Sequence, residues 1–278
     1  MSDAPRVSVV VPVYNAGDYL AEALASVARQ TYRDFEVVIV DDGSTDPRTR
    51  AILETAAPEP AITVHRTPNR GPALARNYAI ERARGAYILP LDADDWLAPE
   101  FLARTVALLD ADPKLGVAYT SVGLVGGHHG VWQTGGFTLV ELLSRCTIHV
   151  SSLYRRELWA DVGGYDPRFV ESCEDWDLWL GAAKRGWTGR GIPDVLVYYR
   201  RSGTSRELGS RAPGVSTRLM RNLVAKHRDA YTAHVEDAMA GMYERLAAAG
   251  LTLERIYHHP AIRLALRLRG FVRRAPAS

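Results

Sequence analysis

Three carboxylates, Asp92, Asp94 and Asp95, directly follow the apolar run at residues 86–90. Such a run is typical of a buried strand, so we expect these acids where the strand reaches the edge of a sheet. Like charges this close repel one another, and a site that keeps them ionised normally supplies a divalent cation or the hydroxyls of a polar ligand. The alternative is that Asp94 or Asp95 only caps a helix beginning near Pro99, because Asp is a favoured N-cap residue.

Two further groups of acids occur at predicted element ends. Asp41 and Asp42 follow the apolar run at residues 35–40. A tight turn with a capped helix explains them, and so does hydrogen bonding to a ligand. Glu174 and Asp175 open a segment with helical spacing, where the helix dipole favours acids and where a carboxylate also suits a general base.

The elements that must position these residues alternate between strand and helix in the first half of the chain. Helix signals follow each of the first three strand signals, and the strand signals lie at residues 7–13, 35–40, 62–64 and 86–90. This alternation predicts an open, doubly wound α/β sheet, which binds ligands beyond the carboxyl ends of its strands. We therefore expect the turns after the first, second and fourth strands to line one crevice.

The second half of the chain is less regular. A glycine-rich loop that includes His128 and His129 is predicted over residues 121–136. After Gly214 the helical signals continue without strand signals, which predicts a C-terminal helical appendage. The remaining expectations are helices over 99–111, 157–162 and 174–185, strands over 116–120 and 195–199, and an extended segment over 146–155.

Composition is that of an ordinary globular chain of 278 residues with a formal net charge of +2. This balance argues against nucleic acid as a partner. Cys146 and Cys173 are expected to be reduced, as in a cytoplasmic protein. No stretch approaches the roughly 18 apolar residues of a membrane-spanning helix.

Taken together, the motifs resemble those of the inverting glycosyltransferases of family 2, which have the GT-A fold. The resemblance covers roughly residues 7–205. The motifs stand in the family's order and approximate spacing, at residues 11–15, 30–32 with 40–46, 69–71 with 75–77, 91–95, 163–166 and 174–179.

The resemblance implies transfer of a sugar from a UDP-, GDP- or dTDP-linked donor to a saccharide, lipid-linked or small-molecule acceptor, as in polysaccharide or glycoconjugate biosynthesis. It assigns Mg²⁺ or Mn²⁺ to Asp94 with Asp92, and the general base to Asp175. Donor-binding positions would be Pro12, Tyr14, Asn15, Asp41, Asp42, Asn69, Gly71, Arg76, Asp92, Ala93 and Asp94. Acceptor or auxiliary positions would be Glu174, Trp176, His149, Arg200 and Arg201.

The chain departs from the family after the strand predicted at 195–199, where many members have a histidine that can bind the metal. Here Arg200 and Arg201 follow, so the third metal ligand stays open. The resemblance also implies a domain at 1–210, with a nucleotide-sugar half at about 1–97 and an acceptor half at about 98–210. Residues 211–278 would form the helical region.

Three other classes of protein could share an α/β sheet of this kind. A dehydrogenase would carry Gly-x-Gly-x-x-Gly after the first strand, where this chain has none. A sugar nucleotidyltransferase would carry a basic, glycine-rich loop there. The remaining alternative is a catalytically silent protein of the same fold, acting as a nucleotide-sugar-binding or membrane-peripheral scaffold, although loss of Asp94 or Asp175 would then be expected.

Residues 255–274 contain six arginines and no acid. From Ile262 onward the apolar side chains would share one face of a helix, with arginines on both flanks. This pattern predicts contact with the inner face of the cell membrane. The alternative is packing on the catalytic domain or on the second subunit of a homodimer.

Overall fold

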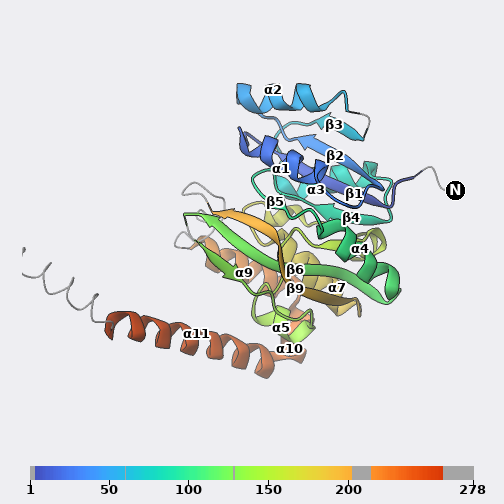
Figure 1. The fold of residues 1–278 in the computed structure, drawn as a ribbon. Helices are drawn as coiled ribbons and strands as arrows, with labels where there is room; N and C mark the ends of the chain where they lie inside the picture. The colour runs from blue at the N-terminus through green and yellow to red at the C-terminus, as the bar shows by residue number, and fades with distance from the viewer. Residues whose placement is uncertain (1–3, 60, 128, 202–213, 259–278) are drawn as a thin grey trace, which may run out of the picture.

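The computed structural model describes residues 4–59, 61–127, 129–201 and 214–258 (Figure 1). The strands are β1 (Val7–Val13), β2 (Phe35–Asp41), β3 (Ile62–Arg66), β4 (Tyr87–Pro90), β5 (Trp96–Leu97), β6 (Leu115–Gly126), β7 (Gly130–Trp132), β8 (Leu153–Arg155) and β9 (Thr188–Arg201). The helices are α1 (Tyr19–Ala28), α2 (Pro47–Ala56), α3 (Pro72–Arg82), α4 (Phe101–Ala111), α5 (Leu139–Ser144), α6 (Arg156–Val162), α7 (Glu174–Lys184), α9 (Val215–Lys226), α10 (Arg228–Ala233) and α11 (Val235–His258), with a short 3₁₀ helix, η1 (Pro167–Phe169).

The strands form one mixed sheet in the order β3-β2-β1-β4-β8-β6-β9-β5, and β7 pairs with β6. β1 runs parallel to both β2 and β4, and β2 runs parallel to β3. β8 is antiparallel to β4 and β6, while β9 is parallel to β6. The predicted α/β sheet of the GT-A type is therefore confirmed, with β3 at its edge.

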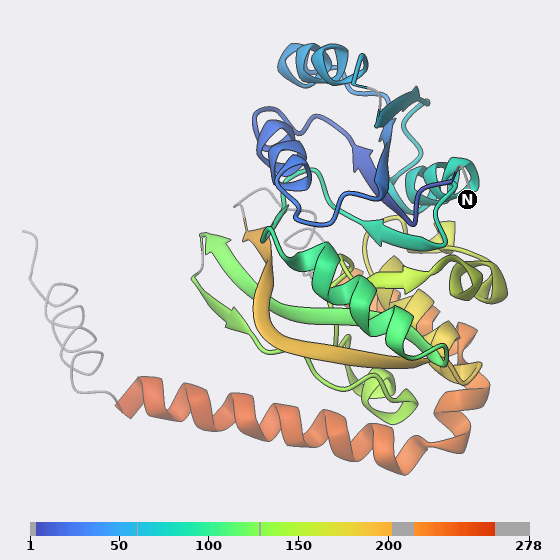
Figure 2. The same cartoon turned by 45° about the vertical axis from the view of Figure 1, so that its right-hand side comes forward.

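The sheet curls because of one short connection. Residues 91–95 alone join β4 to β5, yet β8, β6 and β9 lie between these two strands in the sheet. The pairing of β6 with β9 shifts register near Ser121, as expected where a strand bends. Figure 2 shows the marked bend of β9. The acidic turn after β4 thus joins two distant parts of one curled sheet.

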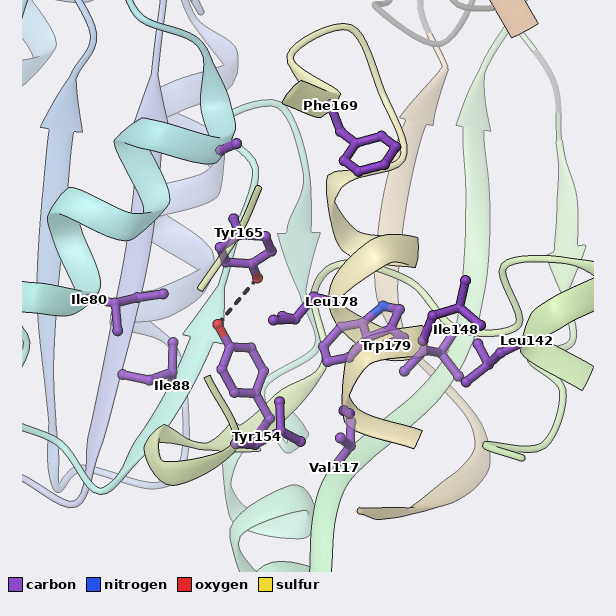
Figure 3. Close-up of a cluster of buried hydrophobic side chains, with 14 of the residues drawn as sticks. Ile80, Ile88, Val117, Leu142, Ile148, Tyr154, Tyr165, Phe169, Leu178 and Trp179 are labelled. Carbon is purple, nitrogen blue, oxygen red and sulfur yellow. Dashed lines mark hydrogen bonds between the residues drawn. The ribbon is translucent and has the colours of Figure 1, made fainter. Parts of the chain in front are cut away.

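Both faces of the parallel strands are buried, which explains the continuous β-branched sequence of β1. Val9 and Val11 pack in the cluster that includes residues of α1 and α4, while Val10 joins the opposite cluster with α3 and α7. The second cluster centres on the fully buried Trp179 (Figure 3). In it the hydroxyls of Tyr154 and Tyr165 lie 3.2 Å apart and share a hydrogen bond.

The loop predicted at residues 121–136 is wrong for residues 121–126 and 130–132, which are strand. β6 continues to Gly126, and β7 folds back so that Trp132 pairs with Val122. Gly126 adopts a φ of +91°, which suits the end of a strand at a tight turn. The glycines of this segment predict an irregular loop, but in the structure Gly126 ends β6 and β7 then pairs with that strand. The extended segment predicted at residues 146–155 contains strand only at Leu153–Arg155.

The helix after the acidic turn begins at Phe101 with Glu100 as its N-cap, and β5 intervenes. Asp94 and Asp95 therefore do not cap this helix, and the capping alternative is excluded. Their position at the joint between β4 and β5 needs another explanation.

The described residues after Gly214 are helical, as predicted. Leu219 and Leu223 of α9 are buried in the cluster around Trp179, and α11 packs against α5. Figure 1 shows α11 running along one side of the body. The boundary predicted near residue 210 and the basic residues from 259 onward lie outside the described residues. Among the helices that the structure describes, none is both long and apolar enough to cross a lipid bilayer.

Candidate active site

One pocket of about 690 Å³ gathers most of the predicted site residues. Its walls come from the turns after β1, β2 and β4, the loop before α3, the first turn of α7 and the segment before β8. The predicted members that line it are Pro12, Tyr14, Asn15, Asp42, Asn69, Gly71, Arg76, Asp92, Ala93, Asp94, His149, Glu174, Asp175 and Trp176. Asp41, Arg200 and Arg201 are not among its lining residues.

The turn after β2 separates the roles of its two carboxylates. Asp41 is fully buried, and its carboxylate accepts hydrogen bonds from the backbone N–H of Ser44 (2.8 Å) and from Nε of Arg66 (2.9 Å). Asp42 lines the pocket and accepts hydrogen bonds from the backbone N–H groups of Arg70 (3.0 Å) and Gly71 (2.8 Å). Asp41 therefore stabilises the turn, while Asp42 fixes the loop before α3 beside the pocket.

Asn15 joins the turns after β1 and β2. Its side-chain oxygen accepts hydrogen bonds from the backbone N–H groups of Thr45 (2.8 Å) and Asp46 (2.9 Å). Asn15 has a positive φ of 50°, a conformation that asparagine tolerates better than most residues. Tyr14, next to it, is 52% exposed. One rim of the pocket thus carries an exposed aromatic ring on a firmly held turn.

The acidic turn after β4 presents its carboxylates in different ways. Asp92 and Asp94 are half-buried and line the pocket, whereas Asp95 is fully buried. Burial, followed by the charges of Asp94 and Asp92, raises the pKa of Asp95 well above its usual value. Arg200 supports this turn from outside the pocket, because its backbone N–H donates to Asp95 (2.9 Å) and its Nε donates to the carbonyl of Asp94 (3.1 Å).

Arg76 links the two acidic motifs. Its guanidinium is 1% exposed and donates through Nη1 to Glu174 Oε1 (2.7 Å) and through Nη2 to Asp92 Oδ1 (2.5 Å). Burial alone would lower the pKa of Arg76, but the charges of Asp92 and Glu174 outweigh it and raise the pKa. Arg76 is therefore a buried cation that ties the turn after β4 to the start of α7.

Asp175 lies in the first turn of α7, half-buried in the pocket. Its Oδ1 accepts the backbone N–H of Trp176 (2.8 Å), whose indole donates to the carbonyl of Leu142 (2.6 Å). Cys173, which precedes the helix, has a φ of 73°, a strained value for a residue other than glycine. The side chains on both sides of Asp175 are anchored, Glu174 by Arg76 and Trp176 by the carbonyl of Leu142.

The rest of α7 is held from its far side. Asp177 is fully buried and meets Nε2 of His227 at 2.8 Å and Nζ of Lys226 at 2.6 Å. Because these partners come from the end of α9 and the residue after it, the C-terminal helices brace the helix that carries Asp175.

The residues present fit a metal that is bound together with a ligand. Within the described part of the chain, no group of three or more His, Cys, Asp or Glu side chains could hold a metal ion. Asp94 faces the pocket with hard carboxylate oxygens that suit Mg²⁺ or Mn²⁺, whereas Asp92 is paired with Arg76. Diphosphate and water oxygens would have to complete such a coordination shell.

Several pocket residues were not predicted from the sequence. Trp132, Tyr199, Cys146 and Cys173 all line it, and both cysteines are free. Trp132 reaches the pocket only because β7 forms a hairpin with β6. The signal was present in the sequence, since glycines at 126, 127 and 130 precede Val131 and Trp132 as in a strand that follows a turn.

The chain is similar to known proteins in sequence and in fold. The model for "Glycosyl transferase family 2" matches residues 8–159, more than half of the chain. A glycosyltransferase of PGL/p-HBAD biosynthesis from Mycobacterium bovis is 35% identical over 63% of this chain and 68% of its own length. The chain spans only 20% of one curated relative and 19% of another, both of them much longer proteins.

Solved structures show the same fold. TarS of S. aureus, solved in complex with UDP-GlcNAc, has a TM-score of 0.67 and 26% identity, over 79% of this chain and 66% of that one. A mannosyltransferase of Pyrobaculum calidifontis, solved with GDP-Man and Mn²⁺, has a TM-score of 0.61 and 23% identity, over 97% and 85% of the two chains. The chain belongs to glycosyl transferase family 2.

Proposed function

We propose that this family 2 glycosyltransferase transfers a sugar from a nucleoside-diphosphate sugar to an acceptor hydroxyl by a single displacement with inversion. The observation that carries the proposal is the convergence of Asp42, Asp94 and Asp175 on one pocket, from the ends of β2 and β4 and the start of α7. The UDP-GlcNAc bound to TarS and the GDP-Man bound to the Pyrobaculum enzyme support this class of donor.

The donor would lie along the strand ends. Asp42 and the loop at residues 69–71 would contact the base and ribose, because they follow β2 and β3 at one edge of the sheet. Asp94 would hold a divalent ion, which would neutralise the diphosphate and stabilise it as a leaving group. Arg76 would keep Asp92 and Glu174 in place rather than bind phosphate directly, since both Nη atoms already donate to carboxylates.

Asp175 would act as the general base. The acceptor O–H would give its proton to the Asp175 carboxylate while the oxygen forms a bond to the anomeric carbon. The bond between that carbon and the diphosphate oxygen would break, and its electron pair would leave with the diphosphate. Inversion follows because the acceptor attacks from the face opposite the leaving group.

The test of the base is Asp175→Asn, a nearly isosteric change. Turnover should fall about 10²-fold or more while donor affinity stays close to that of the parent. Asp237→Asn is the matched control, because Asp237 lies on α11 and is 62% exposed. Equal losses of donor binding and turnover, or a product with retained anomeric configuration, would contradict the assignment.

The test of the metal site is Asp94→Asn, measured by calorimetric titration of UDP, GDP and dTDP with and without Mn²⁺. Mn²⁺ should strengthen nucleotide binding to the parent protein and should have little effect on binding to the variant. If Mn²⁺ strengthened binding equally in both proteins, Asp94 would not be a metal ligand.

A further inference from the structure

Three aromatic side chains from separate elements meet in the part of the pocket that the proposed donor does not use. They are Trp132 of β7, His149 of the segment before β8, and Tyr199 of β9. The ring centroids of Trp132 and His149 lie 6.0 Å apart in an edge-on arrangement, and those of His149 and Tyr199 lie 5.1 Å apart. These rings form a continuous aromatic cluster in the pocket wall.

The cluster shares one pocket with the proposed base and with the acidic turn. His149 Nε2 is 3.7 Å from Asp95 Oδ2, next to Asp94 in the chain. Cys146, which begins the same segment as His149, lies close enough to Asp175 that the charge of Asp175 adds to burial in raising the pKa of the Cys146 thiol. A group that rests on the cluster would therefore lie in the same pocket as Asp175 and Asp94.

The partial exposure of Trp132 and Tyr199 distinguishes them from core aromatics. Trp179 in the core is completely buried, whereas Trp132 and Tyr199 are half-buried with surface turned to the pocket. Aromatic rings bury apolar surface well and still offer a polar atom to a partner. A wall of this kind suits a ligand with an apolar face and a polar rim.

We propose that Trp132, His149 and Tyr199 form an acceptor subsite that binds a pyranose ring of a saccharide or glycoside. A pyranose has a face of C–H groups, which would pack on the aromatic side chains, and a rim of hydroxyls. One of these hydroxyls would then point to Asp175. The proposal rests on the proposed function, and it commits the acceptor to a sugar ring rather than an acyclic alcohol.

The experiment uses the full chain with Mn²⁺ and the best-binding nucleoside diphosphate among UDP, GDP and dTDP. Saturation-transfer NMR then measures contact with methyl glycosides of glucose, galactose, mannose and N-acetylglucosamine, and with sorbitol as the acyclic probe. At least one pyranoside should receive saturation through its ring C–H protons, and sorbitol should not.

Two variants at one position isolate the aromatic contribution. Trp132→Phe keeps a ring in the hairpin and should retain pyranoside contact, while Trp132→Leu keeps an apolar side chain and should weaken binding about tenfold or more. Nucleotide affinity should stay within about twofold of the parent in both variants, a change of under 1 kcal/mol. Trp187→Leu is the matched control, because Trp187 is also half-buried but lies outside the pocket.

Each outcome has a defined meaning. If the nucleotide binds but no pyranoside does, or if sorbitol binds equally well, the subsite is refuted while the proposed function stands. The subsite is also refuted if Trp132→Leu binds the pyranoside as tightly as the parent. If no nucleoside diphosphate binds the parent protein, the proposed function itself fails, and the subsite with it.

Discussion

Removal of the Arg76 side-chain charge tests the link between the two acidic motifs. In Arg76→Met the carboxylate of Glu174, which is 2% exposed, loses its buried counter-charge, while Asp92 at 24% exposure can still meet water. Breaking a buried ion pair by removing one partner costs about 3–5 kcal/mol. Because one of the two carboxylates is partly hydrated, we expect the free energy of unfolding to fall by about 3 kcal/mol, the lower end of that range.

The assay is urea unfolding at pH 7, followed by tryptophan fluorescence, with comparison of the midpoint and the slope m. Arg76→Lys should lower the free energy of unfolding by about 1–2 kcal/mol. A single ammonium group cannot replace a guanidinium whose two Nη atoms donate to different carboxylates. The double variant Arg76→Met with Glu174→Gln should have a free energy of unfolding about 1–2 kcal/mol higher than that of Arg76→Met alone, since the uncompensated buried charge is gone.

Arg48→Met is the control for this series. Arg48 forms an ion pair with Asp18 in which the side chains are 64% and 74% exposed, so its removal should cost about 1 kcal/mol or less. The reasoning is refuted if Arg76→Met costs no more than this control. It is also refuted if the double variant is no more stable than Arg76→Met alone, because the cost would then not come from the charge on Glu174.

Two further changes test the pocket wall at Gly71 and the buried carboxylate of Glu36 at the start of β2. Gly71→Ala places a Cβ 2.6 Å from Val170 Cγ2 at a φ of +88°, so it should lower the free energy of unfolding by about 1–2 kcal/mol and weaken nucleoside-diphosphate binding in a calorimetric titration. Burial would raise the pKa of Glu36, but hydrogen bonds from Arg84 and Ser8 outweigh it and hold the pKa below its usual value. The ionised Glu36 carboxylate therefore stabilises the fold when the pH is above the usual glutamate pKa. This stabilisation is lost as the pH falls through the lower pKa that Glu36 has in the folded protein. In urea unfolding, Glu36→Gln should lower the free energy of unfolding by about 2 kcal/mol at pH 7 and by less at pH 3.5. If the variant differed from the parent by the same amount at both pH values, the ionised Glu36 carboxylate would not be the stabilising group.

Much of the donor half could be predicted from the sequence because its signals are local. The β-branched run Val7–Val13 predicts a strand buried on both faces, and β1 has these bounds. The carboxylates of the 91–95 turn and of Asp42 follow β4 and β2, which lie on either side of β1 and run parallel to it. Parallel strands bring their carboxyl ends to the same edge, so the meeting of these acids follows from the order of the elements alone.

The surroundings of each side chain could not be predicted, because they depend on partners far away in the chain. Asp41 and Asp42 are equivalent in sequence terms, yet only Asp42 lines the pocket, while Asp41 turns to Arg66 of the neighbouring strand. An arginine on a helix is normally solvated. Arg76 can be buried because its guanidinium pairs with Glu174, which is 98 residues away in the sequence.

The sequence by itself therefore determined the family, the parallel strands and the acids at their ends, since each is encoded in a short stretch with a characteristic pattern. The tertiary structure decided the wall of the pocket that we propose for the acceptor. The pairing of β6 with β9 joins segments far apart in sequence, and together with the β6–β7 hairpin it brings Trp132 and Tyr199 beside His149. Such pairing depends on the curl of the whole sheet, which no local periodicity encodes.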